Sequence, residues 1–296
     1  MFEPDPLVIE PPANVEIAAD AASRAAAHWH LPAPTLIRLG ATGVFRAGDV
    51  VLRVCKATAP AEVSLALARQ LQSLGLRVTT PVRNDVVRVN DLSVTAWEFI
   101  EEDVSATRDW EQVGAMVRVL HGIDPAPLHH PMPFCGDFPW WNISLLLDEV
   151  AFADPIAAAA LHEAYASNAW WYATARTGRL VLCHGDVHPG NVLHTAKGPV
   201  LIDWDLLSVG PPEWDHAPLM TWTSRWGGEP GVYEAFAHGY GLAIDLEIAE
   251  AISKLRLVAA TLMRLRAARL RPDNGEAHRR LAYWRGEPNA AQWRAV

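Results

Sequence analysis

Two polar motifs, each close to a short apolar run, constrain this chain more than any other feature of its sequence. The first is His-Gly-Asp-Val-His-Pro-Gly-Asn over residues 184–191, and the second is Ile-Asp-Trp-Asp over residues 202–205. The apolar runs have the length of buried strands, and the glycines and prolines between them require tight turns. One hairpin is therefore expected to carry three oxygen-bearing side chains at its loop ends: Asp186, Asn191 and Asp203.

Oxygen ligands of this kind bind divalent cations such as Mg²⁺, which proteins often hold with one or two carboxylates and the substrate phosphates. In the phosphoryl-transfer site of protein kinases, a catalytic Asp is followed after four residues by an Asn, and then by a second, metal-binding Asp. Asp186, Asn191 and Asp203 occur in this order, and the first two have this spacing. The alternative is a polar hairpin whose Asp and Asn residues only form Asx turns. The agreement of two motifs favours a metal and phosphate site.

The two motifs resemble the signatures of the aminoglycoside phosphotransferase and choline kinase-like family. Its His-Gly-Asp-x-x-x-x-Asn signature matches residues 184–191, and its Ile-Asp-Trp signature matches residues 202–204. The resemblance implies an α+β, two-lobed protein-kinase-like fold, with a small antiparallel sheet in the N-terminal lobe and a mostly helical C-terminal lobe. It implies a nucleotide-binding lobe at residues 1–100 and a lobe with the catalytic loop and substrate pocket at residues 101–296, with nucleotide bound between them.

The same resemblance implies the chemistry of the two motifs. Asp186 would accept the proton of the substrate hydroxyl as that hydroxyl attacks the γ-phosphate of ATP. Asn191 and Asp203 would hold Mg²⁺ against the phosphate oxygens.

Nucleotide contacts are expected from the N-terminal lobe. Gly43 closes a Gly-Ala-Thr-Gly turn, which would let backbone N–H groups approach the phosphates. Arg53 stands where the family has a lysine, and it would contact the phosphates and pair with Glu62, although a guanidinium fork does not replace an ammonium without a change of geometry. Two alternatives remain: Arg53 and Glu62 form only a surface pair, or Lys56, on the opposite face of the strand, makes the contact.

Two further expectations concern the nucleotide base and the substrate. Backbone groups around Glu98 and Ile100, where the family passes from one lobe to the other, would bind adenine. Carboxylates near the second motif predict a cationic substrate, with ordinary solvated surface charges as the alternative. The expected substrate residues are Asp205, Glu213 and Asp215, with Asp148, Glu149, Glu229 and Glu234 on nearby helices and Trp141 or Trp226 against a sugar face. Asp215 also matches an Asp that braces the catalytic loop in the family.

Apolar periodicity predicts elements that agree with this fold. In the N-terminal part, strands are expected at residues 36–39, 44–47, 50–55, 86–89 and 93–99, and helices at residues 15–30 and 61–74. In the C-terminal part, helices are expected at residues 108–121, 140–150, 155–173, 232–241, 246–268 and 276–284.

The composition restricts the kinds of binding partner, location and cysteine chemistry that are expected. The 296 residues are 50% hydrophobic and carry a net charge of −9 without a basic run, which excludes a nucleic-acid partner. No apolar run has the length of a membrane span and no leader is visible, so a cytoplasmic protein is expected. The three cysteines lie far apart in the sequence and indicate neither a zinc site nor a disulfide framework: Cys55, Cys135 and Cys183.

The sequence thus predicts an ATP- and Mg²⁺-dependent phosphotransferase acting on a hydroxyl of a small molecule, an aminoglycoside or amino sugar, with antibiotic resistance as the outcome. One alternative is a kinase of an endogenous metabolite, such as a choline-like compound or a methylthio-sugar. The other is a nucleotide-binding pseudokinase, which the Arg53 departure favours and the retention of Asp186 opposes.

Overall fold

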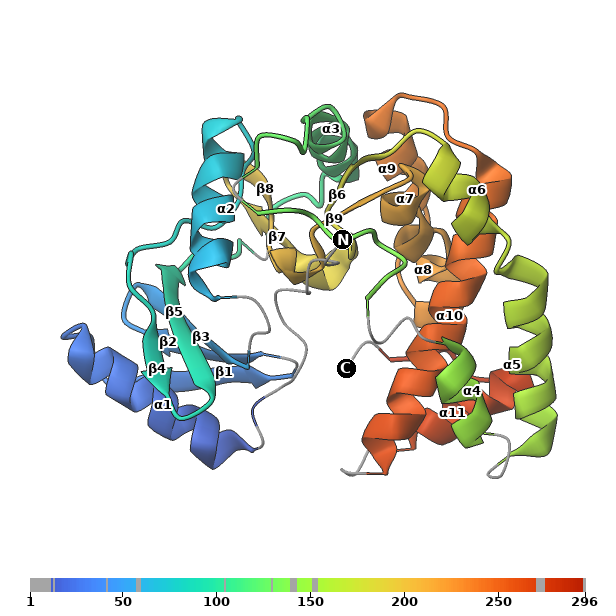
Figure 1. Cartoon of the computed structure of the whole chain (residues 1–296), viewed down its shortest axis with the longest axis horizontal. Coiled ribbons are helices and arrows are strands. Elements are labelled where there is room, and N and C mark those ends of the chain that lie inside the picture. The colour runs from blue at the N-terminus through green and yellow to red at the C-terminus, as the bar shows by residue number, and fades with distance from the viewer. Residues whose placement is uncertain are drawn as a thin grey trace. The chain divides into compact units, whose positions relative to one another are not determined.

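The computed structural model describes residues 12, 14–40, 42–56, 60–103, 105–128, 130–138, 143–150, 154–269 and 275–294 (Figure 1). The chain forms two compact units, and each is made of segments that are distant in sequence. The first unit contains Met1–Asp109, Ile123–Pro133 and Asn191–Leu207, and the second contains Trp110–Gly122, Phe134–Gly190 and Ser208–Val296.

The first unit is built on a five-stranded antiparallel sheet with the strand order β1-β2-β3-β5-β4. Tight turns join β2 to β3 and β4 to β5, and Gly48 and Asn90 take the positive φ angles of 66° and 56° that these turns require. Its strands are β1 (Thr35–Leu39), β2 (Gly43–Ala47), β3 (Val50–Cys55), β4 (Val87–Val89) and β5 (Leu92–Glu98).

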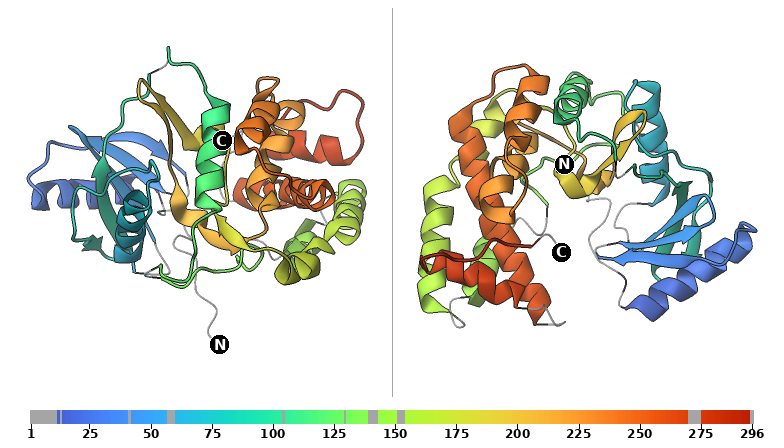
Figure 2. Two further views of the ribbon diagram at one scale, coloured as in Figure 1. Left: turned by 90° about the horizontal axis from the view of Figure 1, so that it is seen from above. Right: turned by 180° about the vertical axis from the view of Figure 1, so that it is seen from behind.

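Helix α1 (Val15–His28) covers one face of this sheet, and α2 (Glu62–Ser73) lies on the other side (Figures 1 and 2). Asn14 caps α1 by accepting the N–H of Ile17 at 2.9 Å. The buried face of α1 consists of alanines, which pack against side chains of the sheet such as Leu52 and Val54. Because side chains alternate along β3, Arg53 points away from α1.

A second hairpin in the first unit lies between the two sequence motifs. The first motif ends just before this hairpin, and the second begins just after it. Its strands β7 (Val192–Thr195) and β8 (Gly198–Leu201) are antiparallel. Leu201 forms a parallel bridge with Val78 after α2, and His194 accepts the N–H of Asp103 at 2.8 Å. Single 3-10 turns, η2 (Pro189–Asn191) and η3 (Trp204–Leu206), flank the hairpin.

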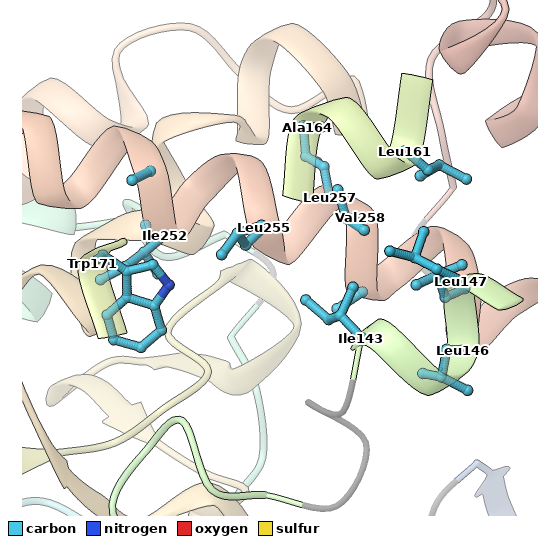
Figure 3. Close-up of a cluster of buried hydrophobic side chains, with 14 of the residues drawn as sticks. Ile143, Leu146, Leu147, Leu161, Ala164, Trp171, Ile252, Leu255, Leu257 and Val258 are labelled. Atoms are coloured by element: carbon cyan, nitrogen blue, oxygen red, sulfur yellow. The ribbon is translucent and has the colours of Figure 1, made fainter. Parts of the chain in front are cut away.

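The second unit is mostly helical, with α10 (Leu246–Ala268) at its centre. Side chains of α4 (Ile143–Val150), α5 (Pro155–Asn168) and α6 (Trp171–Thr177) pack along α10, and the cluster includes the buried Trp171 of α6, as Figure 3 shows. A two-stranded antiparallel sheet, β6 (Val181–Cys183) and β9 (Ser208–Gly210), precedes and supports the first sequence motif. The other helices are α3 (Trp110–Leu120), α7 (Glu213–Met220), α8 (Trp222–Trp226), α9 (Val232–Tyr240) and α11 (Glu276–Trp284).

Helices α3 and α9 approach each other unusually closely. A Cβ atom added at Gly239 would lie 1.9 Å from the carbonyl oxygen of Glu111, and one added at Gly114 would lie 2.0 Å from the carbonyl oxygen of Phe236. Only glycine fits at these two positions, since the atoms in the way belong to the backbone of the facing helix.

The predicted α+β, protein-kinase-like fold is confirmed, and the elements differ from the prediction in detail. The helix expected over residues 155–173 is two helices, because α5 ends at Asn168 and α6 begins at Trp171. The expected helix over residues 140–150 begins at Ile143, and its first positions lie outside the described residues. None of the helices described is both long and apolar enough to cross a membrane.

Candidate active site

The loop after β6 in the second unit carries Asp186, and α7 holds this loop by its backbone. The carboxylate of Asp215 accepts the N–H groups of His184 and Gly185 at 2.8 and 2.7 Å. Nε2 of His121 lies 3.0 Å from Oδ2 of Asp215, the oxygen that also accepts the N–H of His184, and Nδ1 of His121 lies 2.9 Å from the hydroxyl of Tyr240. Burial raises the pKa of Asp215, but its hydrogen bond with His121 and the nearby charges outweigh burial and keep the pKa below its ordinary value.

Asp215 therefore has the bracing position that the resemblance implies, with its carboxylate inside the protein. Its side chain is fully buried, which fits this bracing role better than the predicted contact with substrate. Glu213, the second acid of this stretch, is also buried and accepts the N–H of Asp245 at 2.8 Å, just before α10. Its carboxylate stabilises the start of that helix, a structural role that differs from the predicted contact with substrate.

The carboxylate of Asp186 contacts two basic side chains of the second unit. Arg256 on α10 lies 2.6 Å from Oδ1 and also donates to the carbonyl of Gly185 at 2.9 Å. His188 lies 3.3 Å from Oδ2. Burial alone would raise the pKa of Asp186, but His188, Arg256 and His184 together lower it well below its ordinary range. Asp186 is thus held as an ionised carboxylate that can accept hydrogen bonds.

The predicted metal ligands lie on the β7–β8 hairpin of the first unit. Asn191 precedes β7, Asp203 follows β8, and the N–H of Ile202 donates to the carbonyl of Asn191 at 3.0 Å. The paired strands therefore bring these two residues to the same end of the hairpin. Asp203 has a left-handed backbone with a φ of 66°, a conformation that Asp adopts more readily than most residues.

This pair of residues fits a hard divalent cation. A carboxylate and an amide supply the oxygen ligands that such ions prefer. Both oxygens of Asp203 already contact positive charge, since Arg53 lies 3.2 Å from Oδ1 and Arg38 lies 3.4 Å from Oδ2. These two guanidinium groups offset the charge of the carboxylate and would repel a cation beside it, so a bound divalent ion would have to take their place.

Arg53 has a different partner from the one predicted. Its guanidinium lies 2.5 Å from the carboxylate of Asp205, in addition to the contact with Asp203. Glu62 pairs instead with Arg88 at 2.8 Å on the surface, so the expected pair of Arg53 and Glu62 is corrected to Arg53 and Asp205. Lys56 lies 3.7 Å from Asp91, also on the surface. Arg53 is thus on the side of the sheet that the strand alternation predicted.

Asp205 is occupied by this ion pair, which gives it a role within the first unit instead of a free carboxylate for substrate. Burial raises the pKa of Asp205 to about 7, with the like charge of Asp203 adding to the increase and Arg53 opposing it. For Arg53, the two carboxylates outweigh burial and raise its pKa above the ordinary value, so it stays charged.

The residues expected around the nucleotide lie on the same unit. Gly43 begins β2 and pairs with Val54, and a Cβ added to it would lie 3.3 Å from the side chain of Ala18 on α1. Ala41, two residues earlier in the predicted turn, is outside the described residues. Glu98 and Ile100 line a cavity of about 580 Å³ together with the end of α2 and the β7–β8 turn.

The outlying acids predicted for substrate are exposed on helices or loops of the second unit: Asp148, Glu229 and Glu234. Trp226 packs against Trp222 and Trp293 and lies under Arg280. Trp141 and the side chain of Glu149 lie outside the part of the chain that the structure describes.

Sequence reasoning missed Arg256, which contacts Asp186 most closely. A signal was present, because Arg256 interrupts the apolar run of α10 between the buried residues Leu255 and Leu257. A lone arginine between buried leucines needs an acceptor to compensate its charge. The contact of His121 with Asp215 was also missed, because the sequence showed His121 only as the last residue of an amphipathic helix.

Comparison with known proteins agrees with this geometry. The profile of the phosphotransferase enzyme family matches residues 35–252. The chain belongs to this family. Membership confirms the prediction of a small-molecule kinase. No curated protein sequence matches the chain.

Solved structures share the fold across nearly the whole phosphotransferase chain. A spectinomycin phosphotransferase bound to ADP and spectinomycin is 18% identical, with 88% of this chain and 91% of that chain covered and a TM-score of 0.65. A choline/ethanolamine kinase family protein from Mesorhizobium loti is 21% identical, with 92% and 93% covered and a TM-score of 0.61. An amicoumacin kinase bound to AMP-PNP and Ca²⁺ is 13% identical, with 92% and 94% covered and a TM-score of 0.65.

Proposed function

We propose that this phosphotransferase moves the γ-phosphate of ATP to a hydroxyl of a small molecule, with an amino sugar or aminoglycoside as the first candidate acceptor. The observation that carries the proposal is Asp186, a carboxylate kept ionised by Arg256 and His188 on a loop braced by Asp215. An ionised carboxylate fixed in this way is suited to orient a hydroxyl and take its proton.

In the proposed reaction, the acceptor hydroxyl donates its hydrogen bond to Asp186. The acceptor oxygen forms a bond to the γ-phosphorus while the bond from that phosphorus to the bridging oxygen of ATP breaks. The hydroxyl proton passes to Asp186, and ADP leaves with the electron pair of the broken bond. Arg53, held by Asp205, offsets negative charge on the phosphate oxygens.

Asn191 and Asp203 are the residues that would hold Mg²⁺ in this reaction. The bound ion would neutralise charge on the phosphate oxygens of ATP. We also propose that backbone groups near Glu98 and Ile100 bind adenine, that Gly43 lies in the phosphate-binding turn, and that residues 1–100 and 101–296 divide the nucleotide and substrate roles. Because the reaction consumes ATP, a cytoplasmic location is proposed with it.

Fewer acidic residues support a cationic acceptor than the sequence predicted. Of the acids near the second motif, Asp205 pairs with Arg53, and Glu213 and Asp215 bind backbone groups. Support for an amine in the acceptor now comes from the exposed acids Asp148, Glu229 and Glu234, and from solved structures whose bound molecules include spectinomycin and streptomycin. Phosphorylation of such a compound would give antibiotic resistance.

The test is ATP consumption with a panel of acceptors: spectinomycin, streptomycin, choline, ethanolamine and deaminated amino sugars. Turnover with amines that exceeds turnover with deaminated analogues, and falls with salt, would support a cationic acceptor. Equal turnover of both would remove the cationic class and keep the kinase. Calorimetric binding of Mg-ATP without turnover of any acceptor would favour the pseudokinase.

A matched pair of variants tests the metal site. Asp203→Asn is expected to abolish the Mg²⁺ dependence of ATP binding, because it removes the charged ligand. Asp91→Asn, on an exposed turn of the same unit, serves as the control and should bind Mg-ATP normally. Unchanged Mg-ATP affinity in Asp203→Asn would overturn the assignment of the metal ligand.

A further inference from the structure

The two oxygens of the Asp186 carboxylate have different surroundings within the second unit. Oδ1 lies 2.6 Å from Arg256, a side chain of 17% exposure whose guanidinium also binds the carbonyl of Gly185 at 2.9 Å. Arg256 therefore contacts both the carboxylate and the backbone of the loop that carries it. Trp214 lies beneath the guanidinium at 5.3 Å, which restricts it further.

The other oxygen, Oδ2, lies 3.3 Å from Nε2 of His188. The N–H of Gly190 donates to Nδ1 of the same ring at 3.0 Å, so Nδ1 carries no proton. The ring proton is then on Nε2 and points at Oδ2. The His188 ring stacks on Trp222, with centroids 5.7 Å apart and planes inclined by 18°.

Two helices thus hold the loop through groups of opposite polarity. From α7, Asp215 accepts the N–H groups of His184 and Gly185. From α10, Arg256 donates to the carbonyl of Gly185 and to Oδ1 of Asp186. The first contact fixes the backbone, and the second fixes the rotation of the catalytic carboxylate.

We propose that Arg256 is a positioning residue for phosphate transfer, which fixes the rotation of the Asp186 carboxylate by donating to its Oδ1. This inference rests on the proposed function of Asp186. Arg256 makes one contact with the carboxylate, from Nη2 to Oδ1, while its Nη1 donates to the carbonyl of Gly185. The guanidinium therefore joins the carboxylate to the backbone of its own loop, which fixes the orientation in which Asp186 would meet the acceptor hydroxyl.

The test compares Arg256→Ala and Arg256→Lys with Arg285→Ala. Arg285 is a matched control, because it has 18% exposure and a carboxylate partner at 2.6 Å, Asp154 at the start of α5. Steady-state turnover is measured with Mg-ATP and the best acceptor of the panel, or with water as acceptor if none is used. Nucleotide affinity is measured by calorimetry with Mg-AMP-PNP, and folding by thermal unfolding.

Arg256→Ala is expected to lower kcat by a factor on the order of 10 to 10², with KM for ATP and AMP-PNP affinity within about twofold, because a misplaced reacting group costs this much. Arg256→Lys should recover part of the loss, since an ammonium can still donate to Oδ1. Hydrogen exchange by mass spectrometry should rise in the peptide that contains Gly185 in Arg256→Ala and stay unchanged in Arg285→Ala.

Three results would overturn the proposal: turnover in Arg256→Ala equal to that in Arg285→Ala, equal losses in kcat and nucleotide affinity without rescue by lysine, or unchanged exchange of the Gly185 peptide. The proposed function fails separately, if Asp186→Asn turns over ATP as fast as the unmodified protein. A protein that meets the Asp186→Asn expectation and fails the Arg256 tests keeps the kinase and loses only the positioning residue.

Discussion

Arg53 illustrates how one departure from a family pattern changes its surroundings. A lysine at this strand position would be expected to pair with Glu62 on α2, whereas the arginine pairs with Asp205 and Asp203 and leaves Glu62 to Arg88. Both carboxylate contacts come from one guanidinium nitrogen, Nη2, which lies 2.5 Å from Asp205 and 3.2 Å from Asp203. Arg53 is therefore held by acids of the second motif and not by the helix after its strand.

This ion pair leads to a prediction about nucleotide binding. Asp205→Asn should weaken Mg-ATP binding, because Arg53 loses its closest partner and its fixed position. A double-mutant cycle of Arg53→Ala and Asp205→Asn should give a coupling energy of about 1–2 kcal/mol. Glu62→Gln is the control and should change Mg-ATP affinity little, and a larger effect from Glu62→Gln than from Asp205→Asn would restore the pair first predicted.

Asp186 supports the simplest test of catalysis. Asp186→Asn keeps the size of the side chain and an oxygen for Arg256, but removes the charge that accepts a proton. Turnover should fall by a factor of about 10² or more, the usual scale for a general base, while Mg-ATP affinity measured by calorimetry stays the same. Near-normal turnover would take this role from Asp186.

At the scale of elements, strand alternation and helix periodicity predicted most of the fold. The face of β3 that carries Arg53 followed from alternation, and α11 has the predicted bounds. Contacts distant in sequence were beyond such reasoning: Arg53 meets Asp205 across 152 positions, and Arg256 meets Asp186 across 70. Local patterns fix the direction of a side chain, whereas its partner depends on how the elements pack.

The contact of α3 with α9 gives a prediction for stability. Alanine is favoured over glycine within a helix by roughly 1 kcal/mol. At Gly239, however, the added Cβ would lie 1.9 Å from a backbone oxygen of α3, so the helices must move apart. Gly239→Ala should therefore lower the free energy of unfolding by about 2 kcal/mol or more, at the upper part of the usual range for overpacking.

Chemical denaturation checks this prediction against Gly178→Ala. A Cβ at Gly178 would lie 3.6 Å from its nearest neighbours, an ordinary contact distance. Equal free energies of unfolding for Gly239→Ala and Gly178→Ala would contradict the close approach of α3 and α9.

At the scale of the whole molecule, His216 is expected to make the protein acid-sensitive. It is buried among Phe236, Tyr240 and Tyr233, and neither ring nitrogen has a hydrogen-bond partner among the described residues. Burial, together with the nearby His121 and against Asp215, lowers the pKa of His216 to about 4. An unfolded chain would have its ordinary value of about 6.5.

Between these two values, the unfolded chain binds a proton that the folded chain does not. Stability from this group is therefore complete above about pH 6.5 and is lost as the pH falls towards 4, by about 3 kcal/mol at most. His216→Phe should lose less stability than the unmodified protein between pH 7 and pH 4.5 in urea unfolding. The exposed His162→Gln is the control, and parallel pH profiles for His216→Phe and the unmodified protein would contradict the prediction.

The hairpin of β7 and β8 has a consequence for how the protein is made. The five-stranded sheet is complete once Glu98 has been synthesised, yet the first unit also needs the segment Asn191–Leu207, whose Leu201 bridges to Val78. Domains that are continuous in sequence can fold on the ribosome as soon as they emerge. Here the first unit stays incomplete after its sheet has been made. About a hundred further residues, most of them belonging to the second unit, must be synthesised before the β7–β8 hairpin is available.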